Sequence, residues 1–462
     1  MSIAKASPAK RFFVEMLTRD IELADAILDL LDNCIDGALR SGSKDPKLPY
    51  KGCHAHIDLK PTYFRIADNC GGIPRVLAEE HAFRFGRKDR GRDQDLATVG
   101  VYGIGMKRAI FKLGTNCTIE SRHGEDRFSV TIDKNWIDDD DKWELELSNT
   151  APSLNAAGTK IDIDQLHPSV AIAFSQDKGG FVDDFHQVVQ RHYSYVIEKG
   201  FEIKVNGKLV LASTLQTLFD ANDFDERGGI KPYVYEAEHD GVTVNLVMGL
   251  YEKLPTDQEQ EDSEKGVRNK ESAGWTIVCN DRVVVSSDKT RLTGWGEAGV
   301  PAYHSQFIAL AGIVIFKCND AIKLPVTTTK RGIDQNSELF GHVKEVMRDA
   351  LKHFTSFTNK WKAQSPERDD IQGTVKAIDI RSAAISIPTD KWKAVKKGIQ
   401  GRRFVPTLPE PARENKTRRI QFTKPIEEIA AIGAYLLEDA KAKPADVGIA
   451  TFEWALKKAQ SI

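Results

Sequence analysis

One segment near the amino terminus constrains the fold most strongly, because it combines an apolar face with a dense polar stripe. Over residues 19–39, apolar side chains recur at steps of three and four, as on one face of an amphipathic helix. The polar stripe on the other side falls within two turns and consists of Asp29, Asp32, Asn33 and Asp36. Such a stripe is either a solvated surface or a set of oxygen ligands for a hard cation such as Mg²⁺.

The composition is that of an ordinary globular protein. The 462 residues include 65 Lys and Arg against 67 Asp and Glu, so the formal charge of −2 gives no general sign of a nucleic-acid or membrane partner. We find no apolar run of about 20 residues and no signal-peptide pattern. The six cysteines include no C-x-x-C pair, which is typical of free thiols in a reducing compartment. We therefore expect a soluble, cytoplasmic protein without membrane contact.

The patterns along the chain indicate an α+β protein with several domains. Strand-like runs follow the first helix up to a helical run at 181–198, which predicts a helical layer on a mixed or antiparallel sheet. A second α/β region begins near residue 201 and contains an acidic stretch, 255–272, that we expect to be a disordered insertion. This region also contains a predicted hairpin, with strands at 275–279 and 282–285 joined by a turn at Asn280 and Asp281. We predict domains at 1–200 and 201–362, a basic, proline-containing linker at 363–424 and a pair of helices at 425–462.

Two short motifs stand at the ends of predicted strands. Asp68 directly follows a strand-like run and precedes Gly71 and Gly72, and a carboxylate there can accept a hydrogen bond from an exocyclic amine such as that of adenine. An Asx turn explains the same residues equally well. Thr159 opens another strand, where its hydroxyl can share a nucleobase with Asp68, but alone it carries little weight.

A glycine-rich loop before a predicted helix at 106–113 is the third motif. Its glycines let backbone amides approach a ligand closely, the helix start favours an anion, and its lysine adds a positive charge. A plain turn is the alternative. The loop comprises Gly100, Val101, Tyr102, Gly103, Ile104, Gly105, Met106 and Lys107.

The order and spacing of these elements resemble the GHKL ATPases, the superfamily of the gyrase B subunit, the heat-shock ATPase chaperones, MutL and the MORC proteins. The resemblance spans about residues 29–159 and implies the Bergerat fold, a helical layer on a mixed sheet, which binds ATP. It implies that Asn33 binds Mg²⁺, with Asp36 nearby at the nucleotide. It further implies that Asp68, Gly72 and Thr159 contact adenine and that the glycine loop wraps the triphosphate. A Walker loop is absent from the sequence, which argues against a P-loop enzyme.

Two departures from the family pattern affect what we expect of this site. The residue that orients the attacking water, usually glutamate, is Asp29, which is shorter by one methylene, roughly 1.5 Å, and a misplacement of that order can cost about a hundredfold in rate. We therefore expect an ATPase that is slow, with a nucleotide-sensing module of little or no hydrolysis as the alternative. Cys70 replaces the first glycine of the adenine loop, which bears on loop geometry more than on binding.

A lysine far along the chain offers a second link to this family. The run 324–331 resembles the loop of the transducer domain that, in the MutL, gyrase and MORC branches, sends a lysine to the γ-phosphate, and here that lysine is Lys330. An ordinary exposed lysine is the alternative. The resemblance implies closure driven by Mg²⁺-ATP and homodimerisation into a clamp or switch that acts on DNA or a protein partner, in a repair, chromatin-like or defence role.

The predicted linker carries a strongly basic segment, residues 391–424, with eleven basic and two acidic side chains. Trp392 and Phe404 interleave with the charges, as in a surface that stacks bases of DNA or RNA. A solvated linker is the alternative, and a separately encoded effector protein is another expected partner. The nucleic-acid candidates are Lys396, Lys397, Arg402, Arg403, Arg418 and Arg419.

Overall fold

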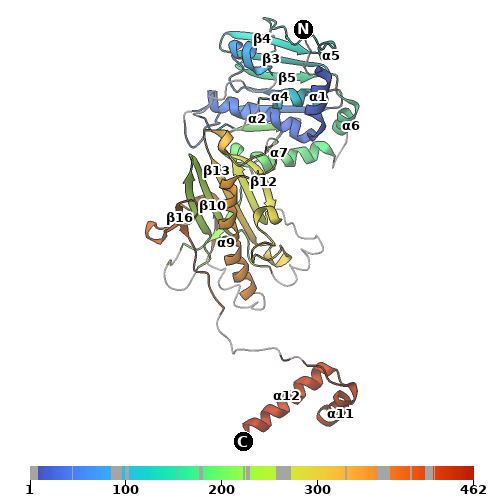
Figure 1. Cartoon of the computed structure of the whole chain (residues 1–462), viewed down its shortest axis with the longest axis vertical. Coiled ribbons are helices and arrows are strands. Elements are labelled where there is room, and N and C mark those ends of the chain that lie inside the picture. Colours follow the sequence, from blue (N-terminus) through green and yellow to red (C-terminus); the bar gives the residue numbers. More distant parts are fainter. Residues whose placement is uncertain are drawn as a thin grey trace, which may run out of the picture. The chain divides into compact units, whose positions relative to one another are not determined.

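A computed structural model gives the fold (Figure 1). It describes residues 9–43, 45–84, 96–98, 103–151, 153–175, 180–221, 224, 229–255, 272–327, 330–361, 375–395, 398–411, 420 and 422–461. The chain divides into two compact units, Met1–Pro411 and Ala412–Ile462, each of which is described by itself.

The first part of the larger unit is a layer of helices on a mixed seven-stranded sheet, as the α+β prediction requires. The strand order is β4-β3-β5-β2-β1-β6-β7, and all neighbours are antiparallel except β1 and β6. The strands are β1 (His54–Lys60), β2 (Tyr63–Asp68), β3 (Cys117–His123), β4 (Asp126–Ile132), β5 (Gly158–Ile163), β6 (Glu202–Val205) and β7 (Lys208–Leu209). The main helices are α1 (Lys10–Arg19), α2 (Leu23–Ser41), α4 (Gly105–Leu113) and α7 (Phe181–Glu198). Shorter helical segments are α3 (Arg75–Leu77), η1 (Ala78–Ala82), α5 (Lys134–Asp138) and α6 (Pro168–Ser175).

Helix α2 is the central element of this layer, because it is buried on nearly every side. Its apolar side chains, such as Ile27, Leu31 and Ile35, are fully buried and join the core of the sheet. Its polar stripe is also covered: Asp29 is 3% exposed and Asp32 0%. A solvated stripe is therefore the wrong interpretation for these carboxylates, and their charges have to be compensated inside the protein.

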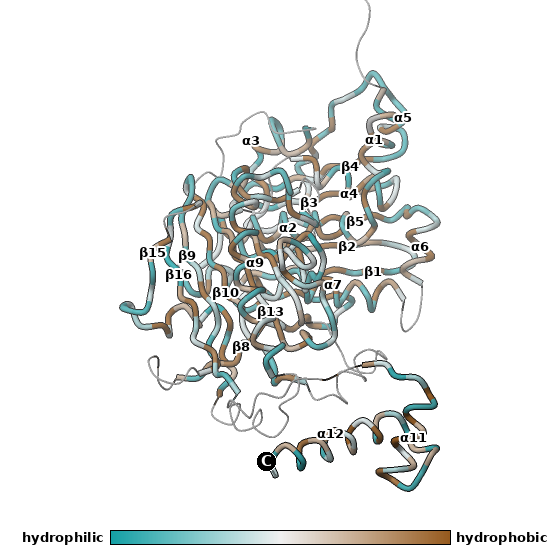
Figure 2. The backbone as a smooth tube through the Cα atoms, turned by 60° about the horizontal axis from the view of Figure 1, so that its bottom comes forward, coloured by the Kyte–Doolittle hydropathy of each residue, from teal (hydrophilic) through white to brown (hydrophobic). Residues whose placement is uncertain are grey.

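A second seven-stranded sheet follows, with the order β12-β11-β13-β10-β9-β16-β15. Apolar residues dominate its strands β10 and β13 (Figure 2), and helix α9 (Glu338–Trp361) packs on it. The predicted hairpin is present as β11 and β12, and its turn residues Asn280 and Asp281 have φ angles of 47° and 68°, in the region that a tight hairpin turn requires. The strands are β9 (Tyr233–His239), β10 (Val242–Leu250), β11 (Gly274–Cys279), β12 (Arg282–Asp288), β13 (Leu310–Lys317), β15 (Lys393–Val395) and β16 (Gly401–Phe404).

The structure differs from the expected linker at 363–424. Strand β14 (Lys376–Asp379) pairs with β8 (Gln216–Phe219), and β16 pairs with β9, so residues 376–404 extend the second domain. These strands are hard to predict because they are short and half-exposed, and because β8 and β9, with which they pair, lie more than a hundred residues earlier in the chain. Of the expected insertion at 255–272, residues 256–271 lie outside the described part.

The smaller unit consists of two helices, α11 (Ile426–Leu437) and α12 (Pro444–Gln460), close to the predicted bounds. Pro444 occupies the first turn of α12, where its missing N–H group is tolerated. Among the described residues, no helix has both the length and the apolar character that crossing a membrane requires.

Candidate active site

The ends of β2 and β5 bring two of the predicted residues into direct contact. These strands are antiparallel neighbours, with Ala67 opposite Lys160. As a result, Asp68 Oδ1 accepts hydrogen bonds from the backbone N–H groups of Cys70, at 2.7 Å, and Thr159, at 3.3 Å. Burial raises the pKa of the Asp68 carboxyl. Asp68 and Thr159, 91 residues apart in the sequence, thus form one polar site where two neighbouring interior strands of the sheet end and begin.

The glycines after Asp68 let the chain pass close to the sheet. Gly72 has a φ of +70°, and a methyl group there would stand 2.0 Å from the carbonyl oxygen of Arg122. Cys70 fits this loop because Gly37 of α2 leaves room for it: a methyl group at residue 37 would stand 2.8 Å from the Cys70 oxygen and 3.1 Å from its Cβ. The departure at Cys70 is therefore accommodated by a glycine on the neighbouring helix.

The close approach at Gly72 gives a testable prediction about stability. Gly72→Ala combines a left-handed backbone, which costs about 1–2 kcal/mol for an L-residue, with a collision against backbone. Gly124→Ala is the matched control, because Gly124 also has a positive φ, +59°, but has open space around it. We expect Gly72→Ala to lower the free energy of unfolding in urea clearly more than Gly124→Ala does. Equal losses would contradict the close packing of this loop.

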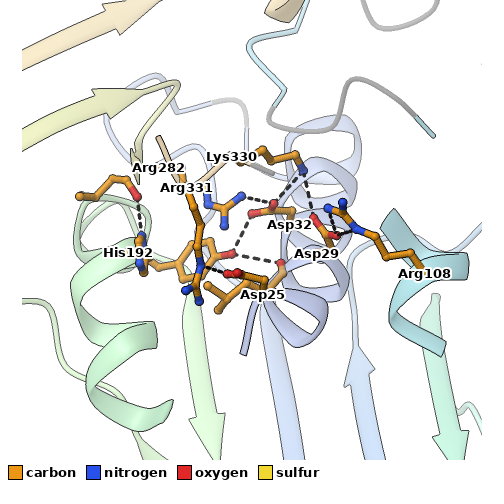
Figure 3. A network of polar contacts seen from close by, with 11 residues as sticks. Asp25, Asp29, Asp32, Arg108, His192, Arg282, Lys330 and Arg331 are labelled. Atoms are coloured by element: carbon orange, nitrogen blue, oxygen red, sulfur yellow. Dashed lines mark hydrogen bonds and ion pairs between the residues drawn. The ribbon is translucent and has the colours of Figure 1, made fainter. Parts of the chain in front are cut away.

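Of the polar stripe on α2, Asn33 alone is exposed, while the three carboxylates around it are buried. Asp29 is held by Arg108 of α4: Oδ2 accepts from Nε at 2.8 Å and from Nη2 at 2.5 Å (Figure 3). The two helices meet closely here, since a methyl group at Gly105 would stand 3.2 Å from the Asp29 Cβ. The start of α4 is thereby fixed against the middle of α2.

Asp32 lies at the centre of a network that joins the two domains (Figure 3). Its Oδ1 accepts a hydrogen bond from the Tyr193 hydroxyl at 2.7 Å. Its Oδ2 accepts from Lys330 Nζ at 2.8 Å and from Arg282 Nη1. Burial by itself would raise the pKa of Asp32, but the charges of Arg282 and Lys330 hold that pKa below its usual value. Asp32 is therefore a buried anion that depends on basic residues of the second domain.

The predicted lysine loop reaches the same helix. Lys330 Nζ lies 3.8 Å from Asp29 Oδ1 in addition to its contact with Asp32, and the Arg331 guanidinium pairs with Asp25. Lys330 is 8% exposed, which rules out the ordinary exposed lysine considered above. The backbone of Lys330 has a φ of +58°, and its N–H donates to the Thr327 oxygen at 2.9 Å, which fixes the point from which the side chain starts.

The glycine loop is described in part. Gly100, Val101 and Tyr102 lie outside the described residues, whereas Gly103 has a φ of +68° and Ile104 precedes α4. Lys107 is buried, and its ammonium donates to the carbonyl oxygens of Ala82, at 3.0 Å, and Gly103. In this structure Lys107 thus holds the loop backbone, and Met106 packs against the core.

The nucleic-acid candidates are engaged with other parts of the chain where the structure describes them. Arg402 pairs with Glu236 at 2.6 Å and lies over the Trp392 ring, and Arg403 is 3.8 Å from Asp349. Phe404 is 7% exposed, so it is not available to stack on a base. Lys396, Lys397, Arg418 and Arg419 lie outside the described residues.

The sequence patterns do not predict several residues of this site, among them Arg108, Tyr193 and Arg282. Arg282 carried a usable signal, because it is a charged residue at the start of the otherwise apolar run Arg282-Val-Val-Val285 directly after a tight turn. A charge in a buried strand requires a buried partner of opposite sign. Arg108 and Tyr193 sit in amphipathic helices, where a polar residue gives no such warning.

Residues 21–165 match the family described as "Histidine kinase-, DNA gyrase B-, and HSP90-like ATPase". The matched part runs from the start of α2 to just past β5 and contains Asp29, Asn33, Asp68 and Thr159, but not Lys330. A search of curated proteins found no match.

Proposed function

We propose that this chain, which through residues 21–165 belongs to the GHKL ATPases, hydrolyses Mg²⁺-ATP at a site that its second domain completes. One observation carries the proposal. Lys330, which is 298 residues from Asp32 in the sequence, is buried against the two carboxylates of α2 that flank the expected phosphate position. A cation in that place neutralises charge on a transferring phosphoryl group.

The binding residues follow from the same geometry. Asp68, supported by the Thr159 N–H, would accept a hydrogen bond from the adenine amine, with Gly72 letting the base approach the backbone. The described residues contain no group of three or more His, Cys, Asp or Glu that could hold a metal by themselves. Mg²⁺ fits Asn33, whose exposed amide oxygen would share it with phosphate oxygens and water, beside the buried Asp36. When bound, Mg²⁺ neutralises charge on the phosphates.

Asp29 would orient the attacking water. Arg108 engages its Oδ2, which leaves Oδ1 directed toward Lys330 at 3.8 Å. Phosphoryl transfer depends on positioning and charge neutralisation more than on covalent help, so Asp29 and Lys330 with backbone amides form a sufficient set. Arg108 holds the Asp29 side chain in place. Because aspartate is shorter than the usual glutamate, the rate of ATP hydrolysis would be low.

A nucleotide-sensing module with little or no hydrolysis is the second candidate. The ion pair of Asp29 with Arg108 favours it, because a carboxylate that already accepts two hydrogen bonds from a guanidinium is a weaker acceptor for a water proton. Both candidates bind ATP, and they differ in turnover.

The proposal extends to a switch or clamp. A lysine supplied by the second domain would couple ATP binding to the arrangement of the two domains. If two such chains dimerise, ATP binding would then close the dimer as a clamp. Helix α1 offers a surface for protein contact, since Phe12 and Met16, one turn apart, are 63% and 50% exposed. DNA or RNA, through the basic residues at 391–424, and a separate effector protein are the proposed targets.

Light scattering with a non-hydrolysable ATP analogue tests the clamp. We expect the mass of the full chain to double when the analogue and Mg²⁺ are added, and to stay that of a monomer with ADP. A chain that binds the analogue and stays monomeric at every concentration would exclude the clamp and leave an intramolecular switch.

A further inference from the structure

Asp32 receives two cations on one oxygen, and this is more than its own charge requires. Both Arg282 and Lys330 donate to Oδ2, while Tyr193 donates to Oδ1. Asp32 is 0% and Arg282 is 1% exposed. If either Arg282 or Lys330 moves away, the other still compensates the charge of Asp32.

The two cations differ in how firmly they are held. Arg282 begins β12, and its guanidinium lies 5.6 Å from the ring centroid of Tyr193, whose hydroxyl oxygen is also 3.1 Å from the Leu28 carbonyl oxygen. Lys330 sits instead on a loop outside the sheet, on a four-carbon stem with rotatable bonds. Arg282 is therefore the resident partner of Asp32, and Lys330 is the exchangeable one.

This difference matters because a buried carboxylate that loses its only counter-ion is strongly disfavoured. If Lys330 were alone on Asp32, moving it to a phosphate would leave an unpaired charge at a fully buried position. With Arg282 and Tyr193 in place, Asp32 stays compensated when Lys330 leaves.

We propose that Arg282 is a positioning residue: by staying on Asp32, it makes Lys330 available to the terminal phosphate of bound ATP. This inference rests on the proposed ATP site. Arg282 itself does not touch the nucleotide. By freeing Lys330, Arg282 would make the chain bind ATP more tightly than ADP, because ADP lacks the phosphate that Lys330 would contact.

The test is the ratio of the ADP and ATP dissociation constants, measured by titration of the full chain. We expect Arg282→Met, which keeps much of the side-chain volume, to lower this ratio about tenfold or more, since Lys330 then stays on Asp32. Arg282→Lys keeps a cation and should hold the ratio near that of the wild type. The double variant Asp32→Asn with Arg282→Met should restore the ratio, because a neutral amide no longer retains Lys330.

A purely structural role for Arg282 predicts something different. Arg282→Met would then lower stability and weaken ATP and ADP equally, and an unchanged ratio would overturn the inference. If Arg282→Met does not fold, Asp32→Asn is tested by itself. We expect the ratio of its ADP to its ATP dissociation constant to equal or exceed that of the wild type. A lower ratio would overturn the inference. A wild-type chain that binds no ATP would instead overturn the proposed function.

Discussion

Asp29→Asn should reduce ATP hydrolysis by about a hundredfold or more while leaving ATP affinity within a few-fold of the wild type. The expectation follows from its place: Asp29 of α2 is 3% exposed, packs against the start of α4 and has its Oδ1 3.8 Å from Lys330 Nζ. A positioned group that accepts or orients a proton contributes typically about 10²–10⁴-fold to the rate. The amide keeps the shape of the side chain and removes that capacity, so the loss should appear in kcat.

Steady-state hydrolysis by the two chains is the measurement, with Asp162→Asn as the matched control. Asp162 is a half-buried carboxylate of β5 that pairs with Arg65 and Lys160, away from α2. The control should keep the wild-type rate. Equal, background-level rates for wild type and Asp29→Asn would favour the nucleotide-sensing module instead, since a chain that hydrolyses nothing cannot lose hydrolysis.

The structural elements that the sequence predicts well depend on residues close together in the chain or on a periodic pattern. The spacing of Asp29, Asp32, Asn33 and Asp36 predicts one helix face, and the turn at Asn280 and Asp281 predicts a hairpin, because helices and turns are set by near neighbours. Lys330 was found through resemblance to a family loop, and the structure places its ammonium 2.8 Å from Asp32.

The features that sequence reasoning missed depend on contacts between distant residues. Arg108 meets Asp29 across 79 residues, and Arg282 meets Asp32 across 250. No periodicity encodes such a pairing, so the sequence pattern of α2 is equally compatible with a solvated stripe, whereas in the structure basic side chains cover Asp29 and Asp32. The contact of Arg402 with Glu236 of β9, 166 residues away, is likewise not visible in the composition of the basic segment.

Lys330→Met should lower the affinity for ATP about ten- to hundredfold and leave the affinity for ADP unchanged. Hydrogen bonds to charged groups contribute about 1.5–3 kcal/mol, which corresponds to that range. The substitution leaves Asp32 with Arg282 and Tyr193, so the site should remain folded. Lys344→Met is the matched control, because Lys344 is likewise largely buried and paired, with Glu297 at 2.9 Å, but on α9.

If a residue of the second domain completes an ATP site in the first, calorimetric titration of these chains with Mg²⁺-ATP and Mg²⁺-ADP will show it. We expect wild type and Lys344→Met to bind ATP more tightly than ADP, and Lys330→Met to bind the two alike. An ATP preference that survives in Lys330→Met, or a wild-type chain that binds neither nucleotide, would contradict this expectation.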